Sequence, residues 1–159
     1  MTKNIPEGYT SLTPYIVMDD VAQAIEFYQK ALGAEVKTAL SLPDGGIGHA
    51  EIQIGNARFM MGAACPQWGG KSAKTLGGSP VSFYVYVDDI EKAFETAKKA
   101  GMTEKMSISD MFWGDRMGTL SDPFALEWSL AQHIREVSEE EIAEAMKKMG
   151  SNSCPHSPE

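Results

Sequence analysis

The chain carries an internal repeat with a spacing of 69 residues. Segment 13–31 (TPYIVMDDVAQAIEFYQKA) aligns with segment 82–100 (SFYVYVDDIEKAFETAKKA), with seven identities in 19 positions and a matching pattern of apolar residues. This period is longer than that of solenoid repeats, which stack units of 20 to 50 residues. The chain is therefore predicted to contain two copies of one larger module.

Each copy predicts the element order βαβββ. A β-rich run ends at a pair of aspartates, which can cap the helix that follows. That helix is amphipathic and ends at a glycine, and three further strands complete the copy. The predicted helices cover about 20–32 and 89–100. The predicted strands are 12–18, 35–41, 49–54 and 58–62 in the first copy, and 81–87, 103–109, 118–120 and 126–132 in the second.

The repeat also predicts how the chain is divided. The segment between the copies is rich in Gly and Pro and has no periodicity, which is typical of a loop. Ser138 and Glu141 form a capping box for a C-terminal helix. We expect one domain over 1–133 with modules at about 10–64 and 80–133, a loop linker at 65–79, a helical segment at 134–150 and a disordered tail at 151–159.

Composition excludes several classes of protein. With 14 Lys and Arg against 22 Asp and Glu, the formal net charge is −8, which disfavours binding to nucleic acid or to an anionic membrane. No apolar run approaches the roughly 20 residues of a membrane span, and the first residues lack the apolar region of a signal peptide. Two cysteines do not imply a disulfide framework. We therefore expect a cytoplasmic protein without nucleic-acid or membrane partners.

Three motifs together carry a resemblance to a known family. They are the helix pattern DDxxxAxxFYxxALGAE and the segments GHAEIQIGNARFMM and FWGDRMGTLSDPF. On these motifs the chain, over about 10–133, resembles the vicinal-oxygen-chelate superfamily of glyoxalase I, bleomycin-resistance proteins and extradiol dioxygenases. It looks most like the PhnB-like (3-demethylubiquinone methyltransferase-like) branch, although Ala125 stands where that branch usually has Gly. The resemblance implies an α+β fold in which two βαβββ modules form a curved, open mixed sheet around a cleft, with the helices outside.

The resemblance also implies where a metal would be held in the enzymes of the superfamily. Those positions fall on Thr13, Met60 or Met61, Ser82 and Ser129 in this chain. Hydroxyls and thioethers are poor ligands for divalent metals that select imidazole and carboxylate. We therefore expect no metal at these positions. A nucleoside cofactor site would ordinarily show a Gly-rich loop between a strand and a helix, followed by an acidic residue that binds the ribose. The sequence has no such pattern, and no cofactor is predicted.

Alternation along the predicted strands selects candidate cleft residues. His49 and Glu51 share one face of their strand, which is either a cleft wall or a polar stripe on a surface or dimer face. The branch usually keeps a His at the position of His49. Tyr84 and Tyr86 share a face with Ser82, although aromatic residues in strands more often fill a core.

The segment 112–130 mixes aromatic and charged residues. Trp113 is a candidate to cover a planar ligand, whereas Trp128 has the opposite parity from Glu127 and is predicted to pack under a helix. Asp115 is expected to have a structural role. Arg116 either forms an ion pair with Asp115 or binds a carboxylate or phosphate of a ligand. The candidate ligand-binding residues are His49, Tyr84, Trp113, Arg116 and Glu127, and the catalytic candidates are His49 and Glu127.

Two classes of function fit these residues. The first is a homodimer that binds a small organic molecule in the cleft. The second is an enzyme, either a metal-dependent isomerase, lyase or dioxygenase with unusual ligands such as His49, Glu51 and Glu127, or a metal-free acid–base enzyme using His49. Because one fold hosts both classes, the fold does not choose between them.

Overall fold

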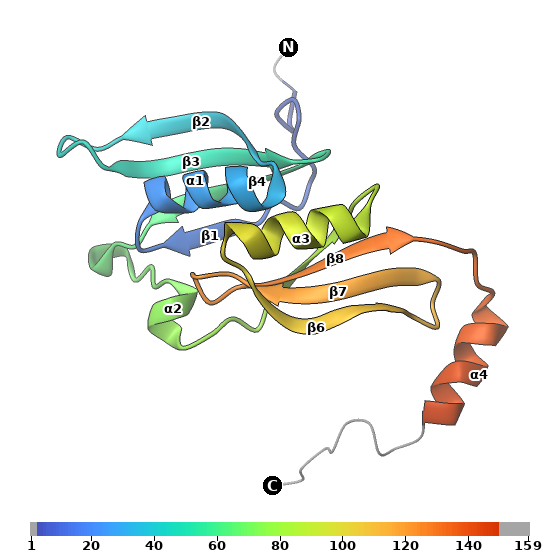
Figure 1. Ribbon diagram of the computed structural model, residues 1–159. Helices are drawn as coiled ribbons and strands as arrows, with labels where there is room; N and C mark the ends of the chain where they lie inside the picture. Colours follow the sequence, from blue (N-terminus) through green and yellow to red (C-terminus); the bar gives the residue numbers. More distant parts are fainter. Residues whose placement is uncertain (1–2, 150–159) are drawn as a thin grey trace, which may run out of the picture.

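The computed structural model describes residues 3–149, which contain two βαβββ modules (Figure 1). The first consists of β1 (Tyr15–Met18), α1 (Val21–Leu32), β2 (Glu35–Ser41), β3 (Ile47–Ile54) and β4 (Ala57–Ala63). The second consists of β5 (Ser82–Tyr86), α3 (Ile90–Ala100), β6 (Thr103–Asp110), β7 (Asp115–Ser121) and β8 (Glu127–His133). The predicted pairing of βαβββ modules is confirmed.

Each module builds its own four-stranded mixed sheet. The strand order is β1-β4-β3-β2 in the first sheet and β5-β8-β7-β6 in the second. In both sheets the first strand pairs in parallel with the last, and the remaining pairs are antiparallel. The predicted α+β class with open, mixed strand pairing is confirmed. The strands were expected in one curved sheet, and they form two four-stranded sheets, one for each module.

The two long helices begin and end in the same way. The side chain of the second aspartate of each pair, Asp20 or Asp89, accepts a hydrogen bond from the backbone N–H three residues later. Gly33 and Gly101 end the helices in the left-handed conformation that a Cβ disfavours, with φ of 64° and 118°. Local sequence therefore sets both ends of each helix.

Helices α1 and α3 lie on the same side of the molecule and contact each other, so each sheet has one covered face (Figure 1). Strand residues that face the helices are buried, such as Met61 and Leu130. The opposite face of each sheet, which we call its open face, carries Tyr15 in the first sheet and Tyr84 and Tyr86 in the second, and all three are exposed.

The covered faces share one core at the junction of the modules. Trp128 of β8 is buried there, as its parity predicts, and its ring packs against Tyr28 of α1 at a centroid distance of 5.2 Å. Phe59 of β4 and Phe83 of β5 stack on each other across the junction, at 6.4 Å. The two modules are therefore held together by aromatic packing as well as by the contact of their helices.

Outside the two modules, two segments differ from the sequence predictions. The linker at 65–79 is not purely a loop: it contains a 3₁₀ turn, η1 (Pro66–Trp68), and a short helix, α2 (Ala73–Leu76), capped by Ser72. Within the predicted segment 134–150, the helix α4 occupies Glu139–Met149, and its capping box of Ser138 and Glu141 is present. The predicted disordered tail at 151–159 lies outside the described residues. Among residues 3–149, no helix has the length and apolar character of a membrane span.

Candidate functional site

A buried carboxylate organises the open face of the second sheet. Asp115 is 2% exposed. Its Oδ2 accepts hydrogen bonds from the Tyr84 hydroxyl at 2.9 Å, the Tyr86 hydroxyl at 3.0 Å and the Trp113 indole N–H at 3.2 Å. Its Oδ1 lies 2.9 Å from Nδ1 of His133. We call these five residues the Asp115 cluster.

Strand order brings the members of this cluster together. Asp115 begins β7 directly opposite His133 at the end of β8. Strand β5 lies on the other side of β8 and projects Tyr84 and Tyr86 to the same face, two residues apart. Trp113 precedes β7 in a turn that Gly114 makes possible, because Gly114 has φ 101° and a Cβ there would collide with the carbonyl of Arg135. The cluster therefore joins three segments that are distant in sequence.

Hydrogen bonding favours the ionised form of the Asp115 carboxylate. Burial opposes ionisation of Asp115, but hydrogen bonds from His133, Tyr84, Tyr86 and Trp113 outweigh it and lower the pKa of the carboxyl. The hydrogen bond to Asp115 raises the pKa of His133. Burial raises the pKa of Tyr84 to about 12, with further contributions from Asp115, so its hydroxyl stays a donor near neutral pH.

The Asp115 cluster presents aromatic surface to the outside. Tyr84 is 44% exposed and Tyr86 63% exposed, and half of the His133 side chain is accessible. A shallow pocket of about 430 Å³ adjoins them, lined by Tyr86, Val87, Asp88, Gln132 and His133. Because a buried carboxylate holds both tyrosine hydroxyls, the rings form a wall on which a planar group can stack, beside an imidazole that can exchange a proton.

The open face of the first sheet carries a second group of polar and aromatic residues. His49 and Glu51 of β3 lie with Nε2 and Oε1 3.7 Å apart, and the Tyr15 ring lies 5.9 Å from the His49 ring. Tyr15 covers Gly62 of β4, where a Cβ would collide with the Tyr15 hydroxyl. We call Tyr15, His49 and Glu51 the His49 cluster.

A buried hydroxyl lies beside the His49 cluster. The Tyr9 hydroxyl is buried and has no hydrogen-bond partner among residues 3–149. Burial raises the pKa of Tyr9 to about 12, and Glu51 is close enough to raise it further without forming a hydrogen bond of good geometry. The Arg58 guanidinium lies over the Tyr9 ring at 5.3 Å. An unpaired buried hydroxyl costs stability, so this donor is suited to an additional polar partner.

The structure brings together two of the five predicted ligand-binding residues. Tyr84 and Trp113 meet on Asp115. His49 lies on the other sheet. Glu127 shares the face of His133 but is exposed at the opposite end of β8, six residues away, which is about 20 Å at the usual strand rise. In one chain, the predicted residues therefore do not form a single site.

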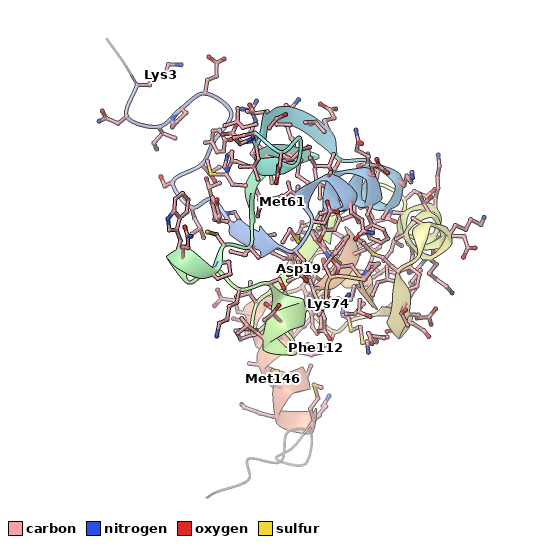
Figure 2. All side chains as sticks on the ribbon, turned by 90° about the vertical axis from the view of Figure 1, so that its left-hand side faces the viewer. Lys3, Asp19, Met61, Lys74, Phe112 and Met146 are labelled. Carbon is pink, nitrogen blue, oxygen red and sulfur yellow. The ribbon has the colours of Figure 1, made fainter. Side chains whose placement is uncertain are left out.

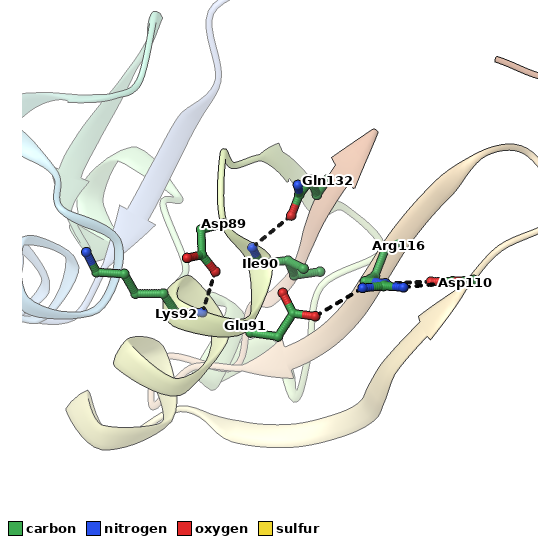
Figure 3. A network of polar contacts seen from close by, with 7 residues as sticks. All are labelled: Asp89, Ile90, Glu91, Lys92, Asp110, Arg116 and Gln132. Atoms are coloured by element: carbon green, nitrogen blue, oxygen red, sulfur yellow. Dashed lines mark hydrogen bonds and ion pairs between the residues drawn. The ribbon is translucent and has the colours of Figure 1, made fainter. Parts of the chain in front are cut away.

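Arg116 requires a correction. It pairs neither with Asp115 nor with an open-face group, because adjacent residues of β7 point to opposite faces. Its Nε and Nη2 donate to the two carboxylate oxygens of Asp110 at 2.6 and 3.2 Å, and its Nη1 donates to Glu91 of α3 at 3.3 Å (Figure 3). Arg116 thus ties α3 to β6 and β7 on the covered side of the sheet.

Sequence reasoning missed the central role of Asp115 and the participation of His133. The parity of β8 contained a signal for His133, since Glu127, Ser129, Ala131 and His133 alternate onto one face. The convergence on Asp115 had no such signal, because it depends on β5 pairing with β8.

The positions that hold a metal in the enzymes of the superfamily do not fit one here. Met60 lies on the open face, whereas Met61 is in the core. The Thr13 hydroxyl donates to the carbonyl of Thr10, and the Ser129 hydroxyl lies 3.0 Å from that of Thr119. In the described part of the chain, no three His, Cys, Asp or Glu side chains are placed to hold a metal ion. Thioether and hydroxyl donors do not match a divalent first-row metal.

Known proteins are similar to this chain in sequence and in fold. Residues 10–130 match the model of the Glyoxalase/Bleomycin resistance protein/Dioxygenase superfamily. An uncharacterized protein of Mycobacterium bovis is 41% identical over 143 residues, which cover 88% of this chain and 94% of the relative.

Solved structures with lower sequence identity show the same fold. The structure of TioX from Micromonospora sp. ML1 has a TM-score of 0.63 at 20% identity and covers 79% of this chain and 99% of its own. The putative 3-demethylubiquinone-9 3-methyltransferase, PhnB protein, from Bacillus cereus has a TM-score of 0.58 at 16% identity and covers 77% of this chain and 99% of its own. Sequence match and fold together lead to one conclusion: the chain belongs to the Glyoxalase/Bleomycin resistance protein/Dioxygenase superfamily.

Proposed function

We propose that this protein binds a small organic ligand in a cleft built by two copies of the chain, without a divalent metal at the positions used by the enzymes of the superfamily. The observation that carries the proposal is the Asp115 cluster. A buried carboxylate that orients four donors is costly to build, and here it holds three aromatic rings at an accessible face. Rigid aromatic surface with few polar groups is the usual composition of a small-molecule site.

The chemistry of the wall suggests the kind of ligand. Tyr84, Tyr86 and Trp113 offer stacking surface, and Asp88 and Gln132 are among the residues that line the adjoining pocket. A planar or partly aromatic molecule with a polar end fits this combination. The proposed ligand stacks on Tyr86 and directs its polar end to His133 or Asp88.

A homodimer would complete the cleft. A single chain leaves aromatic residues exposed on the open faces of both sheets, and an exposed aromatic face is typical of an interaction surface. In the proposed homodimer, the His49 cluster of one copy faces the Asp115 cluster of the other, which unites His49 with Tyr84 and Trp113. The unpaired Tyr9 hydroxyl supplies a further donor on that opposite wall.

The second candidate is a metal-free acid–base enzyme, and one observation favours it. A carboxylate that fixes one nitrogen of an imidazole leaves the other to move a proton. Asp115 holds Nδ1 of His133, and Nε2 lies 3.4 Å from the exposed carboxylate of Glu136. In this version His133 takes the role that the sequence suggested for His49. The proposal also includes membership of the PhnB-like branch, which the motifs and the similarity to the Bacillus cereus protein support. It further includes a cytoplasmic location.

The test is a thermal-shift screen of planar aromatic compounds, followed by titration of the best binder. Tyr86→Ala should weaken binding by about 1–3 kcal/mol, the scale of losing one large apolar contact. Trp68→Ala is the matched control, because Trp68 is 89% exposed in the linker and outside both clusters. Unchanged affinity of a folded Tyr86→Ala variant would reject the site. Sedimentation that shows a 17.3 kDa species alone at micromolar concentration would reject the shared cleft.

A further inference from the structure

Helix α4 has an apolar stripe that nothing covers in the described chain. Ile142, Ala145, Met146 and Met149 recur at the spacing that places residues on one face of a helix. None of the α4 side chains is buried, and Met146 is 59% exposed. Figures 1 and 2 show α4, marked in Figure 2 by Met146, projecting beyond the sheets. The helix also lies beyond residues 10–130, which match the superfamily.

An apolar groove of matching character lies between β1, the linker and the start of β5. Its volume is about 440 Å³, and its apolar lining includes Leu12, Tyr15, Val17, Leu76, Val81 and Phe83. Leu12 is 84% exposed, and Tyr15, Leu76 and Val81 are each more than half exposed. We call this feature the linker groove. It contains no residue of the Asp115 cluster and shares Tyr15 with the His49 cluster.

Charge favours contact between the two features. Lys71 lines the linker groove, Lys74 follows on α2, and no described carboxylate lines it. The first turn of α4 carries Glu139, Glu140 and Glu141. In a chain of net charge −8, the positive charge of Lys71 in this groove complements the acidic end of the helix.

Helix α4 lies away from the linker groove of its own chain (Figure 1). The backbone N–H groups of Ile134 and Arg135 both donate to the Gly114 carbonyl, at 2.9 and 3.2 Å, which fixes the chain beside the end of β8. Three residues then lead to α4, which projects beyond this end of β8 (Figure 1). The groove lies at the other end of β8, beside Leu126, seven residues of strand and about 20 Å away.

We infer that α4 of one copy docks in the linker groove of a second copy. The apolar stripe fills the groove, with Ala145 allowing close approach and Met146 and Met149 adapting to its shape. The acidic first turn lies against Lys71. The contact uses no residue of the Asp115 cluster and one residue, Tyr15, of the His49 cluster.

Cross-linking between two differently labelled chains tests the contact. Both chains carry Cys65→Ser and Cys154→Ser, one carries Met146→Cys and the other Leu76→Cys, and a short bis-maleimide is added to the mixture. The expected result is a covalent species of twice the chain mass. Lys105→Cys, exposed on β6, replaces Leu76→Cys as the control and should not cross-link with Met146→Cys. Absence of the Leu76 product, or equal yield at Lys105, overturns the inference.

Charge exchange provides a second test in the same assay. Lys71→Glu in the Leu76→Cys chain should lower the cross-linking yield by about two- to five-fold, the scale of an exposed ion pair. Glu139→Lys in the Met146→Cys chain should restore it. A chain carrying both cysteines that cross-links only within itself would show that α4 docks on its own chain, and would also overturn the inference.

Discussion

The hydroxyl of Tyr28 in α1 donates a 2.7 Å hydrogen bond to Oδ2 of Asp122, 94 residues later in the chain. The same oxygen accepts from the Trp128 indole N–H at 2.9 Å, and Oδ1 accepts from the backbone N–H groups of Phe124 and Leu126. One buried carboxylate therefore closes the turn between β7 and β8 and joins it to the helix of the other module.

Tyr28→Phe should consequently destabilise the fold. The variant removes a hydrogen bond to a buried carboxylate, and the expected loss in the free energy of unfolding is about 1.5–3 kcal/mol by urea denaturation. Tyr9→Phe is the matched control, because it removes a buried hydroxyl without a described partner and should leave stability unchanged or raise it. Equal losses in the two variants would contradict this role for Asp122.

Ala125→Gly should stabilise the protein. Ala125 has φ 66°, the one positive value outside glycine among residues 3–149, and a left-handed conformation costs a residue with a Cβ about 1–2 kcal/mol. The expected gain is about 1 kcal/mol, visible as a higher Tm. Ala22→Gly, within the helical backbone of α1, should have the opposite effect, a loss of about 0.5–1 kcal/mol. A lower Tm for Ala125→Gly would show that its turn is not strained.

His133 should make stability depend on pH. Its pKa is raised in the folded protein by Asp115, so its contribution is complete below the unfolded pKa of 6.5 and disappears as the pH rises through the folded value. The pKa of Asp115 is lowered, so its contribution is present above its unfolded value of 3.8 and is lost in acid. The stability difference between the wild type and His133→Gln should therefore be largest between about pH 4 and 6.5 and shrink toward pH 8.

An NMR titration of the His133 ring measures the same linkage directly. Asp115→Asn removes the charged partner, and the His133 pKa should return toward its ordinary value. A His133 pKa unaltered by Asp115→Asn would show that the pair does not interact in solution.

Trp113→Ala should weaken a ligand found by screening by about 1–3 kcal/mol, because it removes one aromatic ring and one donor to Asp115. Trp113→Phe retains an aromatic ring and should lose less. Glu127→Gln should have little effect, since Glu127 lies about 20 Å from the cluster along β8. Isothermal titration of the three variants distinguishes them, and tight binding by folded Trp113→Ala would exclude this residue from the site.

Local sequence was sufficient for much of the fold. The 69-residue repeat predicted the two modules. The Asp residues that cap α1 and α3 and the glycines that end them act on neighbours within a few residues. Strand alternation correctly predicted that Trp128 is buried and that Tyr84 lies on the opposite face of the sheet. This prediction needs no tertiary information, because side chains alternate with a period of two in every strand.

Tertiary structure alone decided which charged and aromatic groups meet. Asp115 receives Tyr84, Tyr86 and His133 because β8 lies between β5 and β7, a strand order that no local pattern specifies. Arg116 forms ion pairs with Asp110 and Glu91 because β6 lies next to β7 and α3 packs on the covered side of the sheet. His49 remains apart from Tyr84 because each module closes its own sheet. These partners depend on long-range packing, whereas the elements that carry them depend on local periodicity and capping.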